Sequence, residues 1–164
     1  MPATPISWRD TEPARLAKEL DAMSAVAPSM VWDGRSWAGE PPIWPFDRLE
    51  PDGLSSFVGA DRFVLEILYP EGFPMVPPKF NPISPLADPF ARTMHAWHLN
   101  GDGTICMFQE ADHWDPWSSA ADLVPKAVSW FLQFLLLSRQ EIETMTQAGI
   151  ASDDSLDHLL RCHD

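Results

Sequence analysis

Proline is the residue that most constrains what this chain can fold into. There are 17 prolines among 164 residues, and each removes a backbone hydrogen-bond donor and disfavours helix at the residue before it. We therefore expect few helices and long extended connections. Six of the prolines fall within residues 71–90, which predicts a stiff, extended connection of the kind that often forms a functional loop.

Two helical segments are nevertheless indicated by apolar spacing. Residues 10–27 fit a helix, with Thr11 as its cap, Pro13 in its first turn, and one apolar face; that face contains Leu16, Leu20 and Met23. A longer helix begins at Ser119 or Val124 and is expected to reach about Gln147. The tail, residues 148–164, is read as one short helix or a mobile end.

The strands are expected between these helices. Residues 62–70 alternate in the manner of a half-buried strand and stop at Pro70. Asp33-Gly34 predicts a hairpin turn, residues 41–49 form a candidate edge strand, and residues 51–61 are expected to be a loop. The predicted class is α+β, in a single domain over residues 1–164 with its core at about 10–147.

Net charge and cysteine content limit the classes of partner and the cellular compartment that we expect. The formal net charge is −13, which argues against nucleic acid and membrane surfaces and favours a protein partner with a basic patch or cationic tail, or serves solubility alone. Cys106 and Cys162 do not look like a disulfide framework. The first residues lack a signal-peptide core, and the apolar run 127–137 is too short to span a bilayer. A cytoplasmic protein with reduced thiols is expected.

Residues 95–117 carry the candidate chemistry. Gly101 and Gly103 surround Asp102 and permit a tight turn, so Cys106 is expected just after that turn beside backbone N–H groups. His95, His98 and His113 lie nearby in sequence. A cysteine acts as a nucleophile in its thiolate form, which an imidazole or oriented amides can favour. Taken alone, a cysteine such as Cys106 is more often a small buried apolar residue than a nucleophile.

Two motifs in the sequence favour a catalytic role for Cys106 over a structural one. The first is an apolar strand followed by a proline-rich pattern, carried by Pro70, Phe73, Pro74, Pro77, Pro78 and Lys79. The second is a glycine three residues before a cysteine and a Trp-x-Pro after it, carried by Gly103, Ile105, Cys106, Trp114 and Pro116. In this order the motifs resemble those of ubiquitin-conjugating (UBC) enzymes over roughly residues 10–140. The resemblance implies an N-terminal helix, a four-stranded antiparallel sheet, a Pro-rich loop, a catalytic-cysteine loop and a long C-terminal helix.

The sequence departs from that family in three places. The connection to Cys106 is longer than usual, with an insertion within residues 82–95. The family's His-Pro-Asn tripeptide is absent: His98 stands where its Asn should be, and Asn100 follows two residues later. The first helix carries Arg15 and Lys18 among acidic residues, which weakens the basic face used to dock an activating enzyme; the acidic residues are Glu12, Glu19 and Asp21.

These departures resemble bacterial UBC-like proteins of antiphage operons. Some accompany a cGAS-like nucleotidyltransferase in CBASS systems, and others accompany ubiquitin-like modifiers. Because no activating domain is fused to this chain, the resemblance points to the shorter CBASS type.

The resemblance implies acyl transfer through a thioester on Cys106. The donor is the C-terminus of a cGAS-like nucleotidyltransferase or a ubiquitin-like protein, and the acceptor is a lysine of a target protein. An activating enzyme is a further candidate partner. No cofactor or metal is expected. His98 is the first choice as donor to the oxyanion, Asn100 the alternate, and His95 a brace for the loop. Trp114 and Pro116 are expected to shape the wall beside the cysteine, and the acidic residues Glu110, Asp112 and Asp115 to orient the amine.

Three alternatives remain open at this point. His95, His98, Cys106 and His113 are residues of the kind that bind zinc, although their spacing matches no common zinc pattern. A non-catalytic UBC-fold binding module is the second. A cysteine hydrolase that uses Cys106 and His98 is the third.

Overall fold

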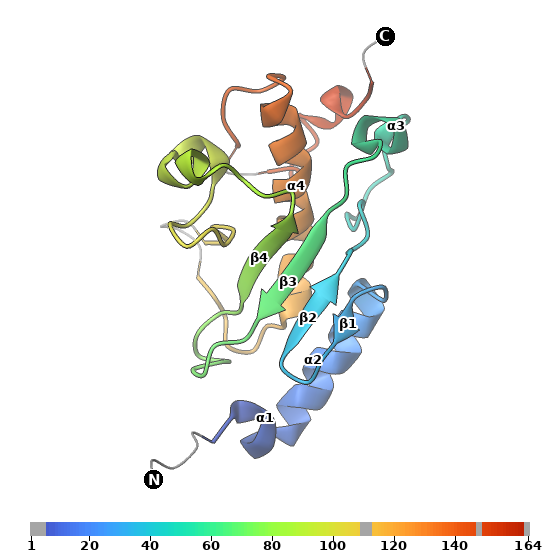
Figure 1. The fold of residues 1–164 in the computed structure, drawn as a ribbon. Helices are drawn as coiled ribbons and strands as arrows, with labels where there is room; N and C mark the ends of the chain where they lie inside the picture. The colour runs from blue at the N-terminus through green and yellow to red at the C-terminus, as the bar shows by residue number, and fades with distance from the viewer. Residues whose placement is uncertain (1–5, 109–112, 147–148, 163–164) are drawn as a thin grey trace.

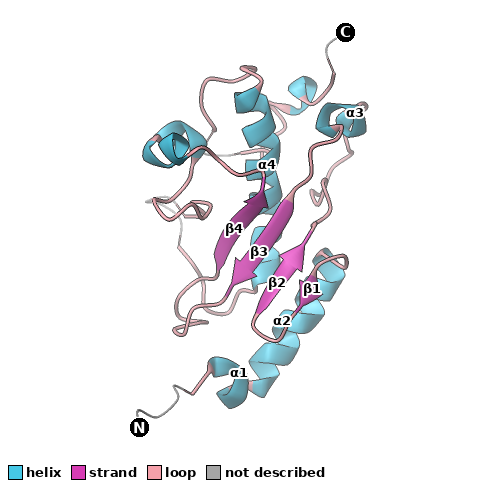
Figure 2. Ribbon diagram, in the orientation of Figure 1, coloured by secondary structure: helices cyan, strands magenta, loops and turns pink. Residues whose placement is uncertain are grey.

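A four-stranded antiparallel sheet is the centre of the molecule (Figures 1 and 2). The structure is a computed structural model, and it describes residues 6–108, 113–146 and 149–162. The strands run in the order β1-β2-β3-β4; their bounds are Val31–Trp32, Ser36–Gly39, Val64–Leu68 and Lys79–Ser84. Helices α2 and α4 lie behind this sheet in the view of Figure 1. The predicted α+β class and the four antiparallel strands are confirmed.

The N-terminal helical segment is split. A short helix α1, Trp8–Thr11, precedes α2, Pro13–Val26. Pro13 takes the first turn of α2 as predicted, but Thr11 ends α1 and does not cap α2. The predicted cap is wrong because Ser7 starts an earlier helical turn, where its hydroxyl accepts a hydrogen bond from the Arg9 N–H at 3.3 Å.

The predicted hairpin at Asp33-Gly34 joins β1 to β2. Asp33 Oδ1 accepts hydrogen bonds from the N–H groups of Arg35 and Ser36, both at 2.8 Å, and Gly34 has a φ of +97°. An aspartate that accepts from the backbone ahead of it, followed by a left-handed glycine, closes a tight turn. The pairing then places Trp37 opposite Ile67 in the central strand.

Two local predictions are wrong. Residues 41–49 contain no strand, and residues 51–61 are not only a loop because they contain the short helix α3, Leu54–Val58. Within the proline-rich segment, Lys79–Ser84 forms the edge strand β4, with Pro82 opposite Leu65. An edge strand tolerates proline because one side of its backbone has no pairing partner.

The long C-terminal helix is shorter than predicted. A 3-10 turn η3, Ala120–Leu123, leads into α4, Val124–Ser138. The expected end near Gln147 is wrong, because the chain leaves the helix at Arg139 and Gln140 has a φ of +61°. The stretch Ala120–Ser138 is long and apolar enough to cross a membrane by length and composition, but 67% of its most apolar window is buried inside the fold, as in a core helix of a soluble protein.

The C-terminal tail packs onto the core. Ile150 and Leu160 have no exposed surface, and the tail contains one 3-10 turn, η4 (Asp157–Leu159). Arg48 holds the tail in place. Its guanidinium donates hydrogen bonds to both carboxylate oxygens of Asp157 at 2.8 Å and to the Ile150 carbonyl at 2.7 Å. The tail is therefore part of the structure that surrounds α4.

The remaining two helical turns belong to the segment before the cysteine. They are η1, Pro89–Thr93, and η2, His95–Trp97.

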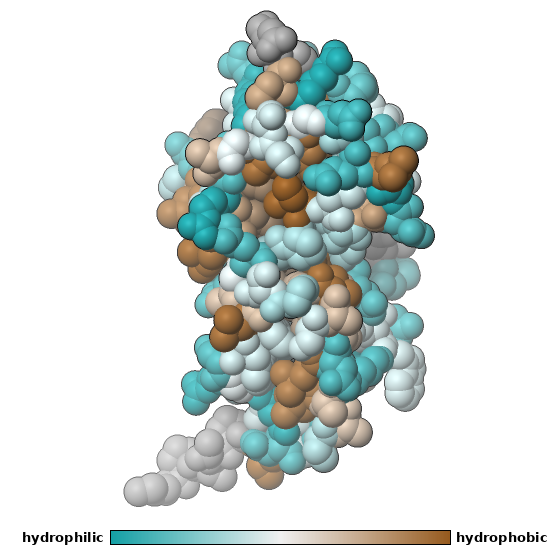
Figure 3. Space-filling view, turned by 90° about the vertical axis from the view of Figure 1, so that its right-hand side faces the viewer, coloured by the Kyte–Doolittle hydropathy of each residue, from teal (hydrophilic) through white to brown (hydrophobic). Residues whose placement is uncertain are grey.

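On the face shown in Figure 3, apolar residues occur in several small areas separated by hydrophilic residues. Such scattered exposed apolar groups are normal for a protein surface.

Candidate functional site

A rigid turn precedes Cys106. The Asn100 N–H donates to the Thr104 carbonyl at 2.8 Å, and the Gly103 N–H donates to the Asn100 carbonyl at 2.9 Å. Asp102 Oδ1 accepts from both the N–H and the hydroxyl of Thr104, at 3.0 and 2.6 Å. Gly103 has a φ of +88°, a conformation that glycine adopts without strain. The sequence placed this turn correctly.

Cys106 lies directly after the turn and pairs with His98 through the backbone. Leu99 and Ile105 form an antiparallel bridge, and the Cys106 N–H donates to the His98 carbonyl at 2.9 Å. The Ile105 N–H donates to the Phe80 carbonyl at 2.8 Å, which joins the turn to β4. The free thiol is partly exposed, and its Sγ lies 3.4 Å from the Phe108 carbonyl oxygen.

Cys106 and His98 both line a cavity of about 40 Å³. The lining residues come from the cysteine turn, from α4 and from the segment that follows α4. They are His98, Ile105, Cys106, Lys126, Ser129, Trp130, Gln133, Met145, Thr146, Gly149 and Ala151. A space of this size accepts a small group such as one water molecule or the oxygen of an acyl group. The cavity therefore places a nucleophile, an imidazole and several polar groups around one small volume.

His98 is held as a neutral side chain more readily than an ordinary histidine. Burial lowers its pKa below the usual value, and the nearby His95 and Lys126 lower the pKa further. A neutral imidazole can accept a proton from a thiol or an amine, or donate its own N–H. His98 also has a φ of +45°, in the left-handed region.

The other predicted site residues lie outside the cavity. The Asn100 side-chain amide donates to the Thr104 hydroxyl at 3.0 Å and to the Ile105 carbonyl at 3.4 Å, so it stabilises the turn. His95 is exposed on η2 and does not line the cavity.

The structure also bears on the acidic residues predicted to orient the amine and on the candidate zinc ligands. Asp115 is exposed, and its Oδ1 accepts from the Trp117 N–H at 2.9 Å, whereas Glu110 and Asp112 lie outside the described residues. Across the part of the chain that the structure describes, no three His, Cys, Asp or Glu side chains lie together in a group that could hold a metal ion. The proposed zinc ligands, which include His113, are thus not gathered at one point.

The wall after the cysteine is fixed by Trp114 and by α2. Trp114 Nε1 donates to the Pro74 carbonyl at 2.7 Å and its ring lies 6.3 Å from that of Phe108. Arg15 Nη1 donates to the Pro116 carbonyl at 2.6 Å, and Lys18 donates to the Trp117 carbonyl. These two cations of α2 are thus bonded within the molecule, which supports the prediction that the helix offers a weak basic face.

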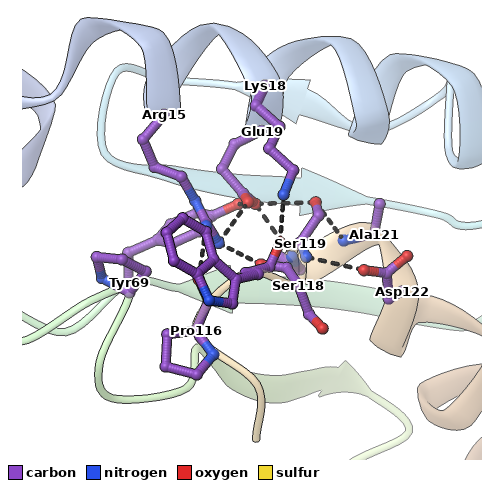
Figure 4. A network of polar contacts seen from close by, with 12 residues as sticks. Arg15, Lys18, Glu19, Tyr69, Pro116, Ser118, Ser119, Ala121 and Asp122 are labelled. Carbon is purple, nitrogen blue, oxygen red and sulfur yellow. Dashed lines mark hydrogen bonds and ion pairs between the residues drawn. The ribbon is translucent and has the colours of Figure 1, made fainter.

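Glu19 anchors the same segment from inside the core (Figure 4). Its side chain is 1% exposed, and its Oε1 lies 3.2 Å from a guanidinium nitrogen of Arg15. Its Oε2 accepts hydrogen bonds from the Tyr69 hydroxyl, the Ser119 hydroxyl and the Ala120 N–H, at 3.0, 3.2 and 3.0 Å. Burial and the Glu19 carboxylate raise the Tyr69 pKa, so Tyr69 stays protonated and donates. These hydrogen bonds hold Ser119 and Ala120, which directly precede α4, against α2.

Sequence reasoning missed the polar residues of α4 and the tail. Ser129 and Gln133 line the cavity from α4, and Thr146 and Gly149 line it from the segment that follows α4. The one available signal was a lone amide inside the apolar run 127–137. An uncharged polar residue in an otherwise apolar helix has to find a partner or line a cavity.

Comparison of the chain with family models, with curated proteins and with solved structures finds no match in any of the three. The residues of the cavity are therefore what indicates a function.

Proposed function

We propose that the protein is a ubiquitin-conjugating-like acyl carrier and transferase with a UBC fold, acting in the cytoplasm. Cys106 would take the C-terminal acyl group of a partner protein, namely a cGAS-like nucleotidyltransferase of an antiviral system, and pass it to a lysine amine. The observation that carries this proposal is the partly exposed Cys106 thiol at a cavity shared with His98.

The chemistry requires an activated donor. The carboxyl group would arrive as an acyl adenylate or a thioester from an activating enzyme. The Cys106 sulfur bonds to the carbonyl carbon, and the adenylate or the first thiolate leaves with the electron pair. An amine then attacks the same carbon, the carbon–sulfur bond breaks, and the amine proton passes to His98 or to water.

The position of His98 supports this role. Its lowered pKa favours the neutral form of the imidazole, which is the form that can accept a proton, and His98 lines the same cavity as Cys106. The braced turn that contains Gly103 supports the same conclusion, because it fixes the backbone on which the nucleophile sits.

The test is a conjugation assay with purified protein, a candidate nucleotidyltransferase and an activating enzyme with ATP. The expected product is a conjugate on Cys106 that a reducing agent cleaves. It should be absent in Cys106→Ala, and in Cys106→Ser it should become an ester that resists reduction. Cys162→Ser is the matched control, and it should conjugate at the wild-type level.

Other outcomes point elsewhere. A reducible conjugate to a ubiquitin-like protein in place of the nucleotidyltransferase would change the donor and keep the chemistry. Binding of either partner that is unchanged in Cys106→Ala, with no covalent product from the wild type, would show a non-catalytic binding module and refute the proposal.

A further inference from the structure

Gln133 is a buried amide in the middle of α4. It is 3% exposed and lies in a run of otherwise apolar residues. Its oxygen Oε1 accepts a hydrogen bond from the Thr146 backbone N–H at 2.8 Å and lies 3.2 Å from the Thr146 hydroxyl. Since a backbone N–H can only donate, this contact fixes which end of the amide is oxygen and which is nitrogen.

The nitrogen end of the same amide lacks an acceptor. Among the residues that the structure describes, none accepts a hydrogen bond from Gln133 Nε2. This nitrogen lies 3.4 Å from the position that a Cβ would take on Gly149, and both Gln133 and Gly149 line the cavity beside Cys106. Nε2 is not among the fully buried side-chain atoms that lack a partner, so it keeps some accessible surface, and a group that enters the cavity can accept its hydrogen bond.

Two nearby polar side chains already have hydrogen-bond partners within the protein. The Asn100 amide donates into its own turn, and Ser129 Oγ accepts from the Ile150 N–H at 2.7 Å. Gln133 Nε2 is thus an oriented, uncharged donor on the cavity that Cys106 shares.

We propose that Gln133 is a catalytic residue whose Nε2–H binds the acyl carbonyl oxygen and stabilises the oxyanion formed when Cys106 attacks. Thr146 positions it by holding Oε1. This inference deepens the proposed acyl transfer and rests on it. Loss of one such donor typically lowers acyl-transfer rates by about 10²–10³.

The experiment compares two reactions of the same sulfur, in a Cys162→Ser background so that Cys106 is the only thiol. With p-nitrophenyl acetate, the thiolate attacks the carbonyl and p-nitrophenolate leaves, so an oxyanion forms on the way. With iodoacetamide, the thiolate displaces iodide at an sp³ carbon, and no oxyanion forms. The ratio of the two rates therefore reports oxyanion stabilisation separately from thiol access and ionisation.

Two variants separate a donor from a structural residue. Gln133→Leu removes the amide without adding a charge, whereas Gln133→Glu keeps an oxygen for the Thr146 N–H, removes the donor and adds a negative charge. Limiting rates at high pH are compared, where the introduced carboxyl is ionised and a shift of the thiol pKa no longer matters. We expect the acylation-to-alkylation ratio to fall about tenfold or more in both variants.

The proposal is overturned if Gln133→Glu keeps the wild-type ratio, or if acylation and alkylation fall by the same factor in it. If Gln133→Leu does not fold, Gln133→Met takes its place, because methionine has a similar length, no charge and no donor. Neither reagent needs a protein partner, so failure to find a conjugate would count against the proposed function while leaving this test intact.

Discussion

The backbone N–H of Cys106 donates a 2.9 Å hydrogen bond to the carbonyl oxygen of His98. This contact joins the two residues without using either side chain. The thiol and the imidazole can therefore be replaced one at a time while the backbone that presents them stays in place.

Replacing His98 should change how stability depends on pH. The pKa of His98 is lowered in the folded protein, so the unfolded chain takes up this proton more readily than the folded one. Stability is therefore lost as the pH falls through the ordinary histidine value toward the folded one. In His98→Asn, urea unfolding between about pH 8 and pH 5 should show a smaller loss.

Asparagine is chosen there because it tolerates the left-handed backbone of this position. Because His95 contributes to the lowered pKa of His98, His95→Asn should also reduce the loss, though less than His98→Asn, since burial is the larger cause. An unaltered pH profile in His98→Asn would show that burial does not hold this imidazole neutral.

Gly103→Ala should destabilise the turn before the cysteine. The left-handed backbone costs an alanine about 1–2 kcal/mol, and the added Cβ would lie 3.0 Å from the Arg92 guanidinium carbon. Urea unfolding measures the loss. Gly101→Ala is the control two residues away, because a Cβ there meets nothing within 4 Å; equal losses in the two variants would contradict this account.

Glu19→Ala should be among the most damaging single changes. It leaves the Arg15 charge without its buried carboxylate and removes an acceptor from Tyr69. Breaking a buried pair from one side costs about 3–5 kcal/mol, which denaturant unfolding can resolve. The exposed residue Glu12 next to the same helix serves as control, and Glu12→Ala should change stability by about 0.5 kcal/mol or less.

Arg48→Ala should loosen the tail and expose the thiol. The change removes the bonds to Asp157 and Ile150, so faster hydrogen exchange is expected in residues 149–160, together with faster alkylation of Cys106 by iodoacetamide. Arg62→Ala breaks an exposed ion pair with Glu40, worth about 0–1 kcal/mol, and should alter neither rate. Identical alkylation in both variants would mean that the tail does not limit access to the thiol.

Short-range patterns in the sequence were the reliable ones. Alternation over residues 62–70 located β3, and Asp33-Gly34 located the hairpin, because both depend on neighbours along the chain. The glycine turn before Cys106 was located for the same reason. The UBC resemblance and the roles of His98 and Asn100 stay predictions.

Long-range packing explains the failures. The strand β4 was not predicted because it contains Pro82, and a proline fits a strand only where that strand lies at the sheet edge. The end of α4 is set by the left-handed Gln140, and a sequence offers no glycine or proline there as a stop signal. Gln133 could be assigned only once Thr146 was seen to hold its oxygen.

The cavity beside Cys106 is built from two parts of the chain that are synthesised at different times. During translation the cysteine emerges from the ribosome well before Met145, Thr146, Gly149 and Ala151, and later still comes Asp157, which Arg48 holds. A nascent chain that has not yet reached these residues carries Cys106 without its complete surroundings. The proposed acyl transfer would therefore require that the chain has been synthesised at least through residue 157.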